Sequence, residues 1–301
     1  MTSFRDELSD LAKGFRWGRR PLTPADAQAH TPERTAWEFP TAWARTKAGV
    51  DARETILDFL MRPLLWSQTS PVVHGTDNLD GLQGPVLFVS NHSSHLDATL
   101  IMTTLPSRWK RRTAVGAAKD YFFDVWWRQA FTALVYGGFP IDRTGGGKGT
   151  ATARDLIEEG WSIVVFPEGA RSPDGWMQRF RHGTARMAIE FDVPIVPIGI
   201  RGAYQAMPKG RFWPKPGRPP ISVRYGRPIA PQPGESHQDL SRRMVQAVAL
   251  LHDEDRSSWW DALHRAEHGE TPSLTGPQGP RWVRNWESSR PLPRRKRTTW
   301  R

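Results

Sequence analysis

One short cluster of polar residues has the spacing of a general base. His92 stands five residues before Asp97, directly after the apolar run 85–90. An aspartate that binds one ring nitrogen of a histidine fixes the tautomer and leaves the other nitrogen to accept a proton. A metal site made of His92, His95 and Asp97 is the alternative interpretation. No second closely spaced histidine pair accompanies them, so we expect no bound metal.

A second cluster, at 137–150, combines glycines with Arg143 and Lys148. Backbone N–H groups and an arginine fork suit a phosphate, which makes this segment a candidate anion site. The glycine spacing differs from that of a nucleotide P-loop, and Lys148 is followed by Gly149 rather than Ser or Thr. A flexible glycine turn is the alternative interpretation.

The third cluster, FPEGARS at 166–172, follows the β-branched run 161–166 and contains Glu168, Gly169 and Arg171. At the exit of a strand it would present a carboxylate, backbone N–H groups and a guanidinium together. Such a turn can bind a phosphate, and N–H groups near Gly169 could stabilise a developing oxyanion. A surface salt bridge at a sharp turn would have the same pattern.

The elements that must position these clusters alternate along the chain. Apolar runs predict strands at 85–90, 112–118, 161–166, 193–200 and 221–226, and helices at 119–136, 149–160, 184–192 and 236–267. Strands separated by helices predict an α/β fold, with a single mainly parallel or mixed sheet flanked by helices. The carboxyl ends of such strands are where open α/β sheets place their sites. Two prolines, Pro194 and Pro197, lead us to expect the 193–200 strand near an edge.

Taken in order, these segments resemble the four sequence blocks of the glycerolipid acyltransferase family, the lysophosphatidate (1-acylglycerol-3-phosphate) acyltransferases. The resemblance covers roughly residues 70–230. The matching positions are Asn91, His92 and Asp97 in N-H-x4-D, Phe139, Ile141 and Arg143 in the second block, 166–172 in F-P-E-G-x-R-S, and 193–197 in V-P-I-x-P.

The resemblance implies transfer of a fatty acyl group from acyl-coenzyme A or acyl carrier protein to the free hydroxyl of 1-acyl-sn-glycerol-3-phosphate, which makes phosphatidate. His92 would be the base and Asp97 its orienting partner, and no cofactor would be permanently bound. The substrate-binding residues that it implies are Arg143, Glu168, Gly169, Arg171, Lys119 and Arg181. Two alternatives stay open: another lyso-lipid acceptor (a lyso-ornithine lipid or a glycolipid), and a non-catalytic protein that binds anionic lipid or nucleic acid.

Composition narrows the classes of chemistry and of partner. The chain of 301 residues has no Cys, which excludes a cysteine nucleophile, an iron–sulfur cluster and disulfides. Its net charge is +11, and residues 281–301 hold eight Lys/Arg, one Glu and three Trp. Arginine interleaved with tryptophan suits an anionic membrane surface. We do not expect nucleic acid as a partner, and a solvated tail without a binding role is the other interpretation.

The pattern divides the chain into four parts. We expect an N-terminal, partly helical extension (1–51), an acyltransferase domain (52–232), a helical segment (233–270) and a disordered basic tail (271–301). The domain would begin with an amphipathic helix at 52–66, kinked or broken at Pro63, whose apolar face packs on the core or touches a membrane. Because the chain shows neither a long apolar run nor a signal-like start, we expect a cytoplasmic protein, peripheral on the inner face of the cell membrane.

Overall fold

The computed structural model describes residues 41–118, 126–141 and 147–290. The strands are β1 (Ser70–His74), β2 (Leu87–Ser90), β3 (Thr113–Ala118), β4 (Phe139–Ile141), β5 (Ser162–Val165), β6 (Ile195–Arg201) and β7 (Pro220–Tyr225). The helices are α2 (Lys47–Ile56), α3 (Arg62–Gln68), α4 (Leu96–Thr104), α5 (Ser107–Lys110), α7 (Trp126–Tyr136), α8 (Gly147–Glu158), α9 (Gly183–Phe191), α10 (Ala203–Ala206), α11 (His237–Arg256), α12 (Trp259–Glu267) and α13 (Arg281–Ser289). Shorter helical turns are η2 (Ala42–Arg45), η3 (Leu57–Met61) and η4 (Thr76–Leu79).

Within the described residues, seven strands form one sheet in the order β1-β7-β6-β2-β5-β3-β4. All neighbouring pairs are parallel except β6 and β7, so the predicted mixed α/β sheet is confirmed. Strand β2 lies in the centre, where Val89 pairs with Val165 of β5 on one side and with Pro197 of β6 on the other. The carboxyl ends of β2, β5 and β6 therefore lie along the same edge.

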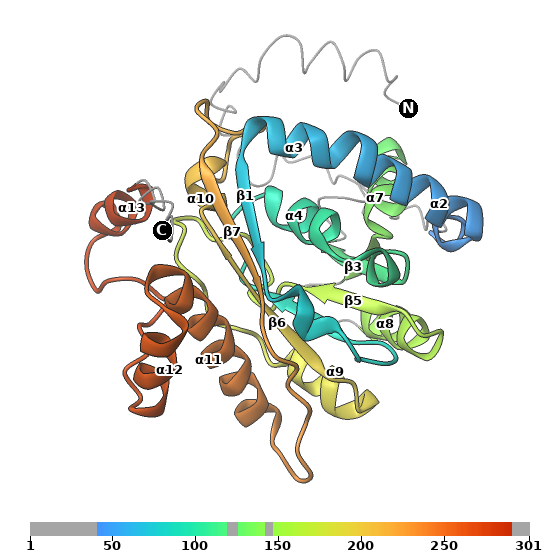
Figure 1. The fold of residues 1–301 in the computed structure, drawn as a ribbon. Coiled ribbons are helices and arrows are strands. Elements are labelled where there is room, and N and C mark those ends of the chain that lie inside the picture. The colour runs from blue at the N-terminus through green and yellow to red at the C-terminus, as the bar shows by residue number, and fades with distance from the viewer. Residues whose placement is uncertain (1–40, 119–125, 142–146, 291–301) are drawn as a thin grey trace, which may run out of the picture. The chain divides into compact units, whose positions relative to one another are not determined.

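Alternating side chains of β2 enter two separate cores. Phe88 packs with residues of α4 and α7 on one face, whereas Leu87 and Val89 pack with residues of α8, α9 and α11 on the other. All three side chains are fully buried. Figure 1 shows α3, α4 and α7 on one side of the sheet and α9 and α11 on the other. A central strand covered on both faces explains why this segment reads as a continuous apolar run.

The positions of the strands depart from the sequence prediction in two ways. Strands β1 and β4 were not predicted, and both lie at the ends of the sheet. The expectation that 193–200 forms a strand near an edge is wrong, because β6 pairs with β2 and β7 in the interior. Its proline is tolerated because antiparallel pairing with β7 begins only at Ile198, and Pro197 contributes its carbonyl oxygen to Gly226 N–H at 2.8 Å.

The predicted 52–66 helix is present and is interrupted. Helices α2 and α3 are joined by the π-helical turn η3, which ends with the bond from Arg62 N to Leu57 O, and Pro63, which has no N–H to donate, follows directly. Leu57 and Leu65 are buried in the core, but Phe59 and Leu60 are 82% and 59% exposed. Core packing therefore accounts for only part of the apolar face.

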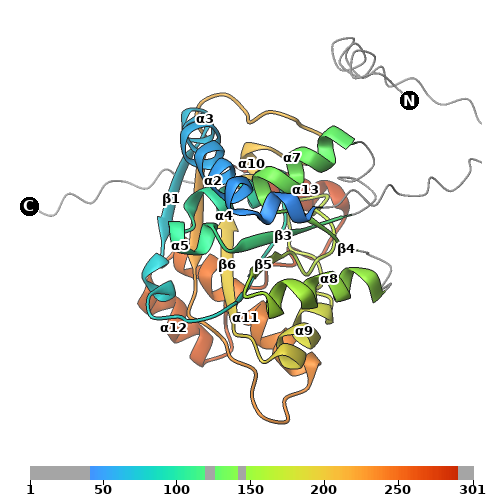
Figure 2. The same ribbon diagram turned by 90° about the vertical axis from the view of Figure 1, so that its right-hand side faces the viewer.

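The C-terminal region is more ordered than the sequence suggests. Helices α11 and α12 confirm the predicted helical segment. The prediction of disorder after 271 is wrong for residues 281–289, which form α13. Both Figure 1 and Figure 2 show α13 beside α10. Among the described residues, none of the helices has the length and hydropathy needed to span a bilayer.

Candidate active site

The loop after β2 brings His92 and Asp97 together. His92 Nδ1 lies 2.9 Å from Asp97 Oδ2, and the aspartate side chain is fully buried while the histidine is 20% exposed. Asp97 lies in the first turn of α4, where a carboxylate is favoured by the free N–H groups. The backbone N–H groups of Ser93 and Ser94 donate to the same Oδ2 at 2.7 and 2.8 Å. The contact expected from the spacing is therefore formed.

These contacts select one tautomer of His92. Because Asp97 Oδ2 acts as an acceptor, the proton lies on His92 Nδ1, and Nε2 carries the lone pair. The ring of Phe166 stacks on the imidazole at 4.1 Å between centroids and 22° between planes. Stacking restricts rotation of the ring, so Nε2 keeps one direction. The arrangement is that of a general base with an orienting carboxylate.

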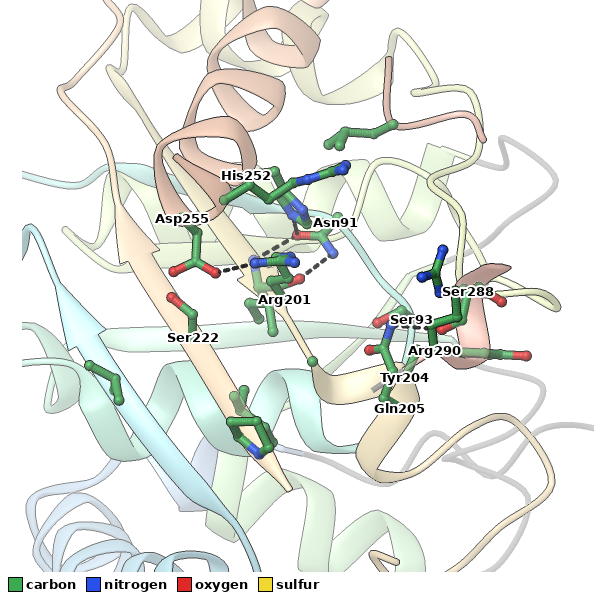
Figure 3. A pocket seen from close by; sticks show the side chains of 18 of the residues that line it. Asn91, Ser93, Arg201, Tyr204, Gln205, Ser222, His252, Asp255, Ser288 and Arg290 are labelled. Carbon is green, nitrogen blue, oxygen red and sulfur yellow. Dashed lines mark hydrogen bonds and ion pairs between the residues drawn. The ribbon is translucent and has the colours of Figure 1, made fainter. Parts of the chain in front are cut away.

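The residue before His92 ties the loop to the neighbouring strand and to α11 (Figure 3). Asn91 Nδ2 donates to Ile200 O, and Asn91 Oδ1 accepts from Ile200 N, both at 2.9 Å. His252 Nε2 lies 3.2 Å from the same Oδ1, so it is the donor of that pair. Burial, followed by the charge of Arg201, lowers the pKa of His252 to about 4. His252 is therefore neutral at physiological pH.

The carboxyl group of Glu168 binds the main chain of two segments, the loop after β2 and the loop after β5. Its Oε1 accepts from His92 N at 2.7 Å, and its Oε2 accepts from Gln178 N at 2.8 Å. The side chain is buried, and burial raises its pKa to about 8 although the two N–H donors act in the opposite direction. The predicted substrate contact of Glu168 stays a prediction. The contacts observed here are with backbone and give Glu168 a positioning role.

The turn at Gly169 has a left-handed residue and a guanidinium beside it. Gly169 has φ +75°, and a Cβ at this position would lie 2.8 Å from Arg181 Nε. Arg181 is exposed at the surface, so its guanidinium is accessible from solvent. The N–H of Gly169 donates to Phe166 O at 3.0 Å. The turn itself therefore uses this N–H, and the expectation that N–H groups near Gly169 stabilise an oxyanion stays a prediction.

Arg171 lies beside the His92 loop, because the N–H of the next residue, Ser172, donates to His92 O at 2.8 Å. Burial, then the positive charge of Arg171 and the proximity of His92, lower the pKa of His95 to about 4. His95 is thus neutral beside His92. On its other side, the turn borders a hollow of about 460 Å³ that Glu168 lines together with residues 178–182, including Arg181. Lys119 and Arg143, the other two predicted substrate-binding residues, lie outside the described residues.

A larger cavity, of about 1340 Å³, borders the loop after β2 (Figure 3). Asn91 and Ser93 form part of its wall, and the rest comes from β1, β6, β7, α10, α11, α13 and connecting loops, including 175–177. Arg201 and Asp255 make an ion pair at 2.8 Å within it. The sequence patterns gave no sign of this cavity, because its walls come from segments more than a hundred residues apart.

The amino-acid sequence resembles those of known acyltransferases over part of the chain. Residues 70–201 match the family model described as Acyltransferase. The chain is 31% identical over 150 residues to a 1-acyl-sn-glycerol-3-phosphate acyltransferase of Limnanthes alba, covering 48% of this chain and 50% of that protein. It is 30% identical over 194 residues to one of Chlamydomonas reinhardtii, covering 62% and 55%. The chain thus spans about half the length of the curated relatives it matches.

A solved structure shares the fold. The 1-acyl-sn-glycerophosphate acyltransferase PlsC from Thermotoga maritima aligns with a TM-score of 0.58 and 22% identity. The alignment covers 74% of this chain and 86% of that one. At this identity the likeness shows the fold alone.

Proposed function

We propose that residues 70–201, which match the Acyltransferase family model, form an acyltransferase domain of the glycerolipid acyltransferase family, and that the chain acylates the free hydroxyl of 1-acyl-sn-glycerol-3-phosphate to make phosphatidate. The acyl donor is a thioester of coenzyme A or of acyl carrier protein. The observation that carries the proposal is the 2.9 Å contact between His92 Nδ1 and the fully buried Asp97. Because Asp97 binds Nδ1, Nε2 is the ring nitrogen that can act as the base.

In the proposed reaction, His92 Nε2 removes the proton of the acceptor hydroxyl as its oxygen attacks the thioester carbonyl carbon. Asp97 stabilises the imidazolium that forms, because its Oδ2 accepts from the protonated Nδ1. When the carbon–sulfur bond breaks, the imidazolium returns the proton to the leaving sulfur. The products are the ester and a free thiol, so the step needs neither an acyl-enzyme nor a bound cofactor.

Arginines around the loop after β5 support a phosphorylated acceptor. Arg171 lies close enough to the His92 loop to lower the pKa of His95, and Arg181 lies against Gly169. Guanidinium groups bind phosphate oxygens in a fixed geometry and so can align the acceptor hydroxyl with His92. We assign the same role to Lys119 and Arg143 from the family resemblance alone.

We further propose that the enzyme works at an anionic membrane, on its cytoplasmic face, because the acceptor is a lipid. The basic segment 281–301 supports this location, because it holds eight Lys/Arg and one Glu. Each basic residue near an anionic surface adds about 1 kcal/mol of attraction.

Thiol release from a long-chain acyl-coenzyme A, measured with and without lysophosphatidate, tests the proposal. We expect release that depends on the acceptor and that is abolished by His92→Ala. The matched control His264→Ala changes an exposed histidine of α12 and should keep the native rate. Release without acceptor would contradict the proposal in favour of a thioesterase. Absence of release with both acyl-coenzyme A and acyl carrier protein donors would also contradict it, and a lyso-ornithine lipid or a glycolipid that outperforms lysophosphatidate would reassign the acceptor.

A further inference from the structure

Helix α13 presents two tryptophans to solvent. Trp282 and Trp286 are 70% and 60% exposed, and their four-residue spacing places them on one side of the helix. The guanidinium of Arg290 lies 5.4 Å from the ring centre of Trp286. Large exposed aromatic side chains beside arginine are typical of a surface that binds a partner.

The opposite side of α13 contacts the loop after β5. Arg284 Nε donates to Asp174 Oδ2 at 2.8 Å, and Trp176 Nε1 donates to Arg284 O at 3.0 Å. Burial alone would raise the pKa of Asp174, but Arg284 and the N–H of Trp176 hold that pKa below its ordinary value. Asp174 is therefore ionised, and α13 is held by a charged contact.

From Asp174 a continuous set of contacts leads to the base. Asp174 Oδ1 accepts from Ser172 Oγ at 3.1 Å, and Ser172 N donates to His92 O at 2.8 Å. Ser172 is thus fixed between Asp174 and the backbone of His92. A displacement of α13 would act on the catalytic loop through these two residues.

Charge distinguishes α13 from its neighbour α12 and identifies the partner. Trp259 and Trp260 of α12 are also exposed, at 45% and 73%, but the helix carries two acidic residues and one Arg. By contrast, residues 281–290, which comprise α13 and Arg290, carry three Arg and one Glu. Tryptophan is enriched at the headgroup level of membranes, and basic residues are attracted to anionic lipids. An anionic lipid surface therefore fits α13 and does not fit α12.

We propose that α13 docks on an anionic lipid bilayer through Trp282 and Trp286, and that Arg284 and Asp174 connect this docking to the position of the His92 loop. The link to catalysis rests on the proposed function. Docking then has two effects: it brings the enzyme to its lipid acceptor, and it keeps the loop after β5 in place beside His92.

Sedimentation of the full chain with vesicles tests the docking. Vesicles of phosphatidylglycerol and phosphatidylcholine are compared with phosphatidylcholine alone at physiological salt. We expect Trp282→Ala/Trp286→Ala to weaken binding to the anionic vesicles at least about five-fold. The matched control Trp259→Ala/Trp260→Ala removes the same two side chains from α12 and should change binding by less than about two-fold.

Two results would overturn the docking. One is equal binding of the native chain and the α13 variant, or an equal loss in the α12 control. The other is displacement of the protein from vesicles by a single-stranded oligonucleotide, together with loss of oligonucleotide binding in the α13 variant. That result would assign the surface to nucleic acid.

Acyl transfer to a short-chain, water-soluble acceptor and to a vesicle-embedded acceptor tests the link. The α13 tryptophan variant should lose more rate on the embedded acceptor than on the soluble one. Arg284→Gln should lower kcat on both acceptors, with partial recovery in Arg284→Lys, because lysine can still pair with Asp174. An unchanged kcat for Arg284→Gln would overturn the link. If the native chain acylates neither acceptor, the proposed function fails, while the sedimentation result still decides the docking.

Discussion

Two segments reach the carboxyl edge of the sheet, the loop after β2 and helix α13, and different kinds of contact hold them there. The loop is fixed by bonds between buried side chains and the main chain: Asn91 to both backbone groups of Ile200, and Glu168 to His92 N. Helix α13 is fixed by side chains that are partly exposed, including the Arg284–Asp174 pair. Buried bonds leave an unsatisfied group when broken, whereas water can replace exposed ones.

The two segments therefore differ in how much change they tolerate. A general base must keep its position to within a fraction of an ångström. The contacts of Asn91 and Glu168 give the loop after β2 that precision. A surface helix that binds a soft partner gains from contacts that can be exchanged. We therefore expect large effects from changes around His92 and graded ones toward α13.

The largest effect is expected for Asp97→Asn. The amide has no negative charge to stabilise the imidazolium. Its NH2 group can donate to Nδ1 and so favours the tautomer with the proton on Nε2. We therefore expect kcat to fall on the order of 10³–10⁴-fold. Steady-state thiol release with lysophosphatidate measures this change. As a check on folding, the variant should keep the native circular dichroism spectrum. A loss of less than ten-fold in a folded variant would contradict the orienting role.

A smaller effect is expected for Glu168→Gln. The NH2 group of glutamine would face one of the two backbone N–H donors, and two donors cannot bond. The lost bond costs about 1–3 kcal/mol. The resulting shift of His92 should lower kcat by about ten-fold to a hundred-fold. The pH dependence is distinctive. Between pH 4.5 and about 8 the unfolded chain has lost this proton and the folded chain keeps it, so the free energy of unfolding falls as pH rises.

Urea unfolding at several pH values measures that contribution. The free energy of unfolding of the native chain should fall relative to Glu168→Gln between pH 4.5 and 8 and run parallel to it above pH 8. Parallel curves throughout would contradict the buried, protonated state of Glu168.

Gly169→Ala is expected to act on the acceptor side. The left-handed backbone costs about 1–2 kcal/mol with a side chain, and the new Cβ would displace Arg181 from its 2.8 Å approach. The KM for lysophosphatidate should rise several-fold more than kcat falls. Gly160→Ala is the matched control, because Gly160 has φ +81° and open space around its Cβ position. Equal KM values for the two variants would contradict a role of Arg181 in acceptor binding.

The smallest effect is expected at α13. Gln205→Ala removes the 2.7 Å bond to Ser288 O, which is one of several contacts of this helix. Because water can replace it, kcat with a soluble acceptor should change by less than about two-fold. A loss as large as that of Glu168→Gln would erase the distinction between the two segments.

The sequence predicted the central part of the fold because its signals are local. Strands β2, β5 and β6 are apolar runs bounded by turn residues, and the spacing of His92 and Asp97 is that of a loop entering a helix. Strand β4 escaped prediction because it has three residues, one of them proline. Strand β1 is a short, half-buried edge strand that starts with Ser-Pro, so it gave no alternating pattern either.

Contacts between distant segments were not predictable from patterns. The partners of Glu168 are backbone N–H groups, one of them 76 residues away, and no side-chain pattern reports such a bond. His252 reaches Asn91 across 161 residues. The basic composition after 271 suggested disorder, but Arg284 pairs with Asp174 across 110 residues, and this tertiary contact supports α13.

A double-mutant cycle on His92 and Asp97 tests whether the two residues act as one general base. Acceptor-dependent thiol release is measured for the native chain, His92→Ala, Asp97→Ala and the double variant. If Asp97 acts only through His92, the double variant should be no slower than His92→Ala alone. Additive losses in the double variant would contradict the orienting role of Asp97. A His92→Ala variant that retains the native rate would contradict the role of His92 as the base.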